Sequence, residues 1–80
     1  MKMGLEVGVI SIHLNGEPRD VPEGLTLDTL LQWMKLPRDR VAVERNLAIV
    51  ARDRWPQTPV LAGDRFEVVH FVGGGRTLSH

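Results

Sequence analysis

The chain has 80 residues, of which 42% are hydrophobic and 25% are charged, so we expect one small globular domain rather than a disordered segment. Ten basic and ten acidic residues give a formal net charge of zero, which supports neither a nucleic-acid groove nor an anionic membrane surface as partner. The sequence contains no cysteine, which excludes disulfides, thiolate nucleophiles and cysteine-ligated metal sites, and which fits a reducing cytoplasm.

The first elements in the chain predict a β-hairpin. Residues 7–14 are rich in β-branched side chains and alternate in part between apolar and polar, as a half-buried strand does. Asn15-Gly16 follows and is a strong signal for a hairpin turn, because both residues tolerate positive φ. Glu17–Val21 is then the returning strand, and its Pro18 favours an edge position because proline cannot donate to the ladder.

One helix is predicted next. Thr26 is a plausible N-cap, Pro37 stops the helix, and the length is about ten residues. Four apolar residues recur at the spacing of one helical face. They are Leu27, Leu30, Leu31 and Met34.

The second half of the chain predicts further strands around a loop. Val41–Val43 and Leu47–Val50 are expected to be short extended segments, and Arg52–Pro59 a loop with one helical turn in which Trp55 is the apolar plug. Arg65–Val72 is the last clear strand. A hairpin, a crossing helix and later strands predict an α+β fold of the β-grasp (ubiquitin-like) kind, a mixed sheet with one main helix packed on one face.

The last eight residues are the informative part for function. We expect residues 1–72 to form the domain and residues 73–80 a flexible glycine-rich tail, since Gly73–Gly75 leads into Arg76–His80. A phosphate-binding loop would need a helix after the glycines, and only five residues remain. The third interpretation is a carrier tail, in which glycines without Cβ atoms pass a reactive carboxylate through a narrow channel of another protein.

The segment from Ile10 to Gly75, about four-fifths of the chain, resembles the small sulfur-carrier proteins of the ThiS/MoaD kind. Two of the matching segments, Asn46–Val50 and the Arg54-Trp55 pair, look more like the thiazole-pathway carriers than the molybdopterin-pathway carriers. The matching segments in chain order are Leu14-Asn15-Gly16, Pro22-Glu23-Gly24-Leu25-Thr26-Leu27, Val41-Ala42-Val43, Asn46-Leu47-Ala48-Ile49-Val50, Arg54-Trp55, Leu61-Ala62-Gly63-Asp64-Arg65-Phe66-Glu67-Val68-Val69 and Val72-Gly73-Gly74-Gly75.

The resemblance implies a β-grasp protein that is a carrier, not an enzyme. Gly74 and Gly75 would be the working pair, with Gly75 adenylated and then converted to a thiocarboxylate. The implied partners are an E1-like adenylyltransferase (ThiF type) that consumes the ATP, a thiazole synthase (ThiG type) and, indirectly, a cysteine desulfurase. The chain itself would hold no cofactor.

Apolar residues beside the glycines are the expected partner-docking site. Val69 and Phe71 fall on the strand face opposite Phe66 and Val68, and a sheet with one helix leaves one face uncovered. Val72 and Gly73 continue this expected site toward the tail.

One departure from the family pattern concerns the residues after the diglycine. The family usually ends there, whereas Arg76–His80 follows Gly75 here, so we expect a peptidase to remove these five residues. Two alternatives stay open, a carrier subunit of molybdopterin synthase and a ubiquitin-like binding module whose tail is inert.

No catalytic or metal site is predicted. His13, His70 and His80 are too dispersed for a metal site, and no carboxylate pair or Ser/His/Asp grouping has catalytic spacing. No apolar run reaches the roughly 18 residues of a membrane span, and the first residues lack the apolar stretch of a signal peptide. We therefore expect a cytoplasmic protein.

Overall fold

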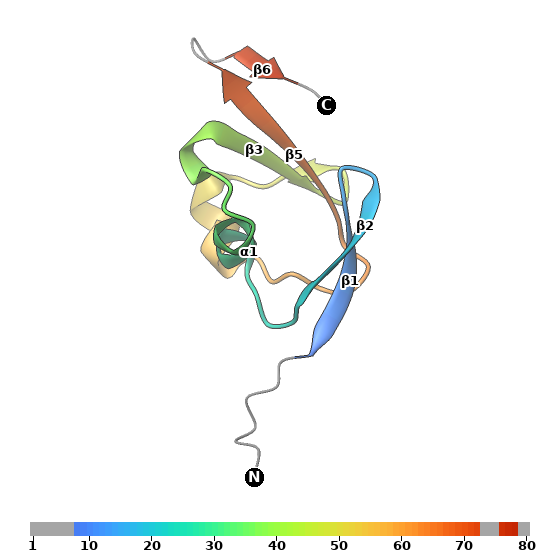
Figure 1. Ribbon diagram of the computed structural model, residues 1–80. Coiled ribbons are helices and arrows are strands. Elements are labelled where there is room, and N and C mark those ends of the chain that lie inside the picture. Colours follow the sequence, from blue (N-terminus) through green and yellow to red (C-terminus); the bar gives the residue numbers. More distant parts are fainter. Residues whose placement is uncertain (1–7, 73–75, 79–80) are drawn as a thin grey trace.

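A six-stranded mixed sheet carries the fold in the computed structural model, which describes residues 8–72 and 76–78 (Figure 1). Five strands follow the order β2-β1-β5-β3-β4, and β6 pairs with β5 outside this path. The strands are β1 (Val9–Leu14), β2 (Glu17–Pro22), β3 (Val41–Arg45), β4 (Ala48–Ile49), β5 (Arg65–Val72) and β6 (Arg76–Leu78). The helical elements are α1 (Leu27–Trp33) and the 3₁₀ helices η1 (Arg38–Arg40) and η2 (Arg52–Gln57).

The predicted hairpin is confirmed. Asn15 and Gly16 have φ values of 50° and 85°, the left-handed conformation that a two-residue turn between twisted strands requires. β2 is an edge strand, which explains how Pro18 is accommodated within it.

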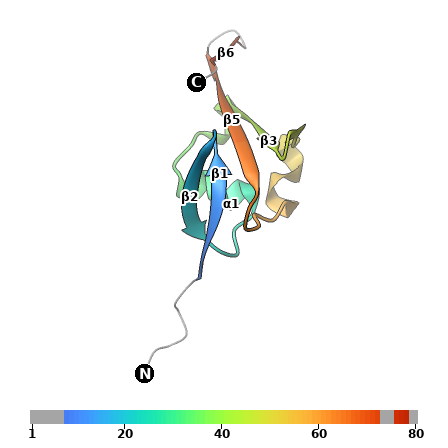
Figure 2. The same cartoon turned by 90° about the vertical axis from the view of Figure 1, so that its right-hand side faces the viewer.

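The sheet is mixed because β1 and β5 run parallel in its centre. His13 lies opposite Arg65 and Leu14 opposite Phe66, whereas β3 pairs with β5 in antiparallel register from Val41 opposite His70 onward. α1 connects the hairpin to β3 and covers one face (Figure 2). The predicted α+β sheet with one helix on one face is therefore confirmed.

The helix begins as predicted and ends earlier. Thr26 is the N-cap and accepts a hydrogen bond from the Thr29 backbone N–H, while the Thr29 hydroxyl accepts one from the Thr26 backbone N–H. At the other end Lys35 has φ 60°, and the Leu36 N–H donates to the Leu31 carbonyl at 2.9 Å. This is a Schellman cap with lysine in the position that glycine usually takes, so α1 has seven residues instead of the predicted ten or so.

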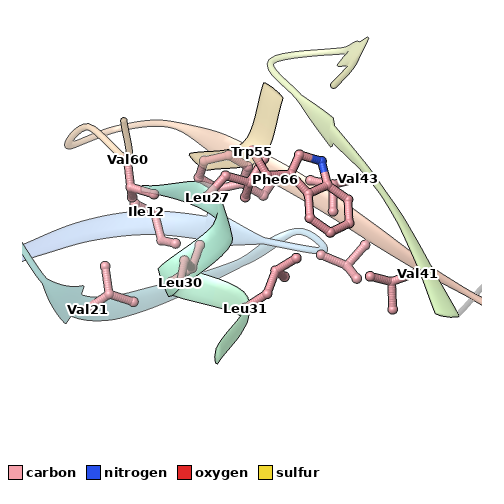
Figure 3. Close-up of a cluster of buried hydrophobic side chains, with 11 residues drawn as sticks. Ile12, Val21, Leu27, Leu30, Leu31, Val41, Val43, Trp55, Val60 and Phe66 are labelled. Carbon is pink, nitrogen blue, oxygen red and sulfur yellow. The ribbon is translucent and has the colours of Figure 1, made fainter. Parts of the chain in front are cut away.

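The core lies between α1 and the covered face of the sheet (Figure 3). Trp55 in η2 is 1% exposed and its indole N–H donates to the Val50 carbonyl at 3.0 Å, which confirms it as the plug of its loop. Arg38 and Arg52 place their guanidinium groups 5.7 and 5.5 Å from the centroid of its ring, within cation–π range. The buried apolar residues are Ile12, Val21, Leu27, Leu30, Leu31, Val41, Val43, Trp55, Val60, Phe66 and Val68.

Candidate functional site

The candidate site is the C-terminal half of β5, which extends past its neighbours in the sheet (Figure 1). β1 pairs only with Arg65 and Phe66, and the last pair with β3 is His70 opposite Val41. Phe71 and Val72 therefore project beyond both neighbouring strands. The strand carries the chain away from the core toward the glycines that the sequence singles out.

The two faces of β5 differ in burial. Phe66 and Val68 are 1% and 8% exposed and belong to the core, whereas Val69 and Phe71 are half-buried on the opposite face because strand side chains alternate. Ala42 on β3 lies directly opposite Val69 and adds to the same face. The structure thus brings the predicted docking residues Val69 and Phe71 together on the sheet face that α1 leaves open.

The other predicted site residues are not described to the same extent. Gly73, Gly74 and Gly75 lie outside the described residues, and Val72 is described by its backbone alone. Arg76–Leu78, assigned to a flexible tail from the sequence, forms β6 and pairs with β5. The division of the chain at residue 72 stays a prediction.

A buried carboxylate fixes the beginning of β5. Asp64 is 6% exposed and accepts hydrogen bonds from Arg45 at 3.1 and 3.3 Å, from the Asn46 amide at 3.3 Å and from the Leu61 backbone N–H at 2.9 Å. Its backbone carbonyl accepts from the His13 N–H at 2.9 Å. Since these donors come from β1, from the end of β3 and from the loop before β5, the cluster joins all three in front of the strand.

The turn residue Asn15 fixes the middle of β5. Its backbone N–H donates to the Phe66 carbonyl at 2.8 Å, and its side-chain Oδ1 accepts from the Val68 N–H at 2.8 Å. The side-chain Nδ2 donates to the Val68 carbonyl at 3.4 Å. Sequence analysis assigned Asn15 to the turn alone, and no local pattern signals its contact with a strand 53 residues later.

Other surface features lie away from this end of β5. A shallow depression of about 400 Å³ between β4 and η2 includes Ile49, which is 75% exposed. A second depression, of about 320 Å³, lies beside Val9 and Trp33 at the start of β1. Among residues 8–72 and 76–78, no group of three histidine or acidic side chains gathers that could hold a metal ion, and no helix is long and apolar enough to cross a membrane.

Comparison with known proteins gives consistent matches over this fold. Residues 12–75 match the ThiS family. The crystal structure of the thiamine biosynthesis protein (ThiS) from Geobacter metallireducens superposes with a TM-score of 0.71 at 33% identity, covering 82% of this chain and all of that one. This similarity identifies the fold as the predicted ubiquitin-like β-grasp.

Curated relatives fall into two size classes. The sulfur carrier protein ThiS of Bacillus subtilis is 40% identical over 50 residues, covering 62% of this chain and 76% of its own. The thiazole synthase of Magnetococcus marinus is 45% identical over 67 residues, covering 84% of this chain. This chain spans 21% of that synthase and 20% of the thiazole synthase of Paramagnetospirillum magneticum. With the family match extending from β1 to the third glycine of the tail, this chain belongs to the ThiS family.

Proposed function

We propose that this chain is a cytoplasmic sulfur carrier for thiamine thiazole biosynthesis, and that it acts as a substrate of enzymes rather than as an enzyme. The observation that carries the proposal is the family match ending at Gly75, directly after a strand that projects from the sheet. The Bacillus subtilis relative named as a sulfur carrier protein supports the same role.

The chemistry takes place on the carbonyl carbon of Gly75. Water first hydrolyses the Gly75–Arg76 amide, which leaves a Gly75 carboxylate and a free amino group on Arg76. An E1-like adenylyltransferase (ThiF type) joins this carboxylate to AMP from ATP and releases pyrophosphate. Sulfur that originates from a cysteine desulfurase then displaces AMP and gives the thiocarboxylate. Gly74 and Gly75 present no Cβ atom beside the reacting carbon, and this chain contributes no cofactor.

Docking of the partners is assigned to the open face at the end of β5. Val69 and Phe71 offer half-buried apolar surface there, and Val72 with Gly73 continues it toward the reacting carbon. Burying such a patch on a partner is favourable because it removes apolar area from water. A peptidase that removes Arg76–His80 completes the set of proposed partners.

A thiazole synthase (ThiG type) is the proposed sulfur acceptor. In two bacteria the segment similar to this chain forms about one-fifth of a protein named thiazole synthase, which supports a functional link between the two activities. The same observation favours the thiazole pathway over a molybdopterin-synthase carrier.

The proposal is tested with a chain that ends at Gly75. Incubated with the E1-like protein of the same organism, ATP and a sulfur donor, this chain should gain the mass of one oxygen-to-sulfur replacement. A matched chain that lacks Gly74 and Gly75 should keep the fold, measured by circular dichroism, and gain no mass. A binding module with an inert tail would bind its partners in both forms and never gain sulfur.

Processing is tested separately on protein from the native host. Mass spectrometry should find a form that ends at Gly75. A mature protein that always retains His80 would contradict the proposed cleavage.

A further inference from the structure

The edge of β5 that faces β1 has three successive occupants in this chain. β1 pairs with Arg65 and Phe66, and the Asn15 side chain then takes the N–H and the carbonyl of Val68. Beyond Val68 neither β1 nor Asn15 reaches the strand. The remaining partner on this edge is β6.

The register shows that β6 lies on this edge. His70 is paired with Val41 of β3 and also with Leu78 of β6. A residue in a sheet has one neighbour on each side, so β6 occupies the side away from β3, which is the side of β1.

The same alternation identifies the hydrogen-bonded pairs. Backbone groups of every second residue point to the same edge of a strand. Since Phe66 and Val68 direct theirs toward Asn15, His70 and Val72 direct theirs toward β6. His70 with Leu78 and Val72 with Arg76 are therefore the hydrogen-bonded pairs, and Phe71 with Thr77 is the non-hydrogen-bonded pair between them.

We propose that the β5 edge at His70 and Val72 is the site where an extended strand of the synthase-type partner adds to the sheet, and that Arg76–Leu78 occupies this site until the chain is cut after Gly75. This inference rests on the proposed function. In the uncleaved chain β6 also holds Arg76 opposite Val72, a position incompatible with an arm extended into a partner. One segment thus blocks both the docking edge and the presentation of the acyl end.

Cleavage removes the block because it changes the order of the binding reaction. While Arg76–Leu78 is covalently attached, its pairing with β5 is intramolecular and has a high effective concentration. After cleavage the five-residue product must bind as a separate molecule, and a pair of short strands is marginal in water. The vacated edge then presents unpaired N–H and carbonyl groups, the template for strand addition.

The pairing itself is tested with engineered cysteines, since the chain has none of its own. Phe71→Cys combined with Thr77→Cys places two thiols at a non-hydrogen-bonded pair, where Cα atoms about 4.5 Å apart are within disulfide range. Phe71→Cys with Leu78→Cys is the matched control, whose side chains point to opposite faces. Mild oxidation should cross-link the first variant and leave the second largely reduced. Equal cross-linking of the two would overturn the register.

The consequence of the pairing is tested with two proline variants. Leu78→Pro removes a donor that bonds to His70, whereas Thr77→Pro lies where the N–H points away from β5. Exchange of the His70 and Val72 amides should be at least about tenfold faster in Leu78→Pro and in the chain ending at Gly75 than in the full chain. Thr77→Pro should exchange like the full chain. Equal exchange in all four forms would refute the occupied edge.

Partner binding completes the test. The thiazole synthase-type protein of the same organism should bind the chain ending at Gly75 about tenfold more tightly than the full chain, and Leu78→Pro more tightly than Thr77→Pro. Equal affinities would refute the docking edge even if exchange differs. Absence of sulfur transfer to the chain ending at Gly75 would refute the proposed function instead, while the cross-linking and exchange results would stand.

Discussion

Replacing Asp64 by asparagine should destabilise the protein by removing the charge that fixes the start of β5. Each carboxylate oxygen accepts two hydrogen bonds: Oδ2 from Arg45 Nε and the Leu61 N–H, and Oδ1 from Arg45 Nη2 and the Asn46 amide. An asparagine of the same shape has one accepting oxygen. Whichever way its amide is turned, two donors face an NH₂ group and lose their acceptor.

The magnitude follows from the burial of the pair. Removing one partner of a fully buried ion pair costs about 3–5 kcal/mol. Here the Asp64 side chain is 8% exposed and that of Arg45 is 28% exposed, so the arginine recovers part of its hydration and we expect about 2–4 kcal/mol. A domain of this length has a total stability of roughly 4–12 kcal/mol, so the loss is a large fraction of the whole.

Urea denaturation followed by circular dichroism measures this loss. The control is Asp20→Asn, an exposed carboxylate on β2, which should change the free energy of unfolding by less than about 0.5 kcal/mol. A double-mutant cycle with Arg45→Met should recover a coupling of about 1–3 kcal/mol between the two side chains. A cost below about 1 kcal/mol for Asp64→Asn would refute the argument that this cluster anchors the strand.

Three further changes separate docking from stability. Phe71→Ala should weaken binding of the synthase-type partner to the chain ending at Gly75 by at least about tenfold in calorimetry. Ile49→Ala, which shortens a 75% exposed side chain outside the proposed patch, should leave affinity unchanged, and equal losses in both variants would argue against the patch. Trp55→Phe removes a buried N–H donor and ring volume at a cost of about 2 kcal/mol, so the melting temperature should fall by roughly 8–16 °C; an unchanged melting temperature would contradict the plug. Asn15→Gly keeps the positive φ but loses the side-chain bonds, and should cost about 1 kcal/mol and speed exchange of the Val68 amide, whereas unchanged exchange would show that the side chain does not hold β5.

Elements whose evidence is local in sequence could be predicted well. The Asn15-Gly16 turn and the alternation in Arg65–Val72 place the hairpin and β5 correctly, because turn chemistry and strand period are properties of neighbouring residues. The end of α1 was wrong because a lysine at φ 60° closes the helix, and lysine carries no sequence signal for that conformation.

Features that depend on distant residues could not be predicted. The four donors to Asp64 and the contact of Asn15 with Val68 join positions that only the folded sheet brings together. β6 was missed for a different reason, since three glycines and a short polar end are typical of a free tail. Only the position of the β5 edge reveals that Arg76–Leu78 has a strand to pair with.

The two halves of β5 divide the demands on this strand. Phe66 and Val68 pack in the core while Asp64 and Asn15 hold the strand from either edge, so changes there act on folding. Beyond His70 no strand of the sheet other than β6 is paired with β5 among the described residues, so changes there cost little stability. A carrier needs this division, because its reactive end must leave the sheet and enter a partner without unfolding the domain that delivers it. The same division explains how a short strand such as β6 can control access, since it competes only with the partner and never with the core.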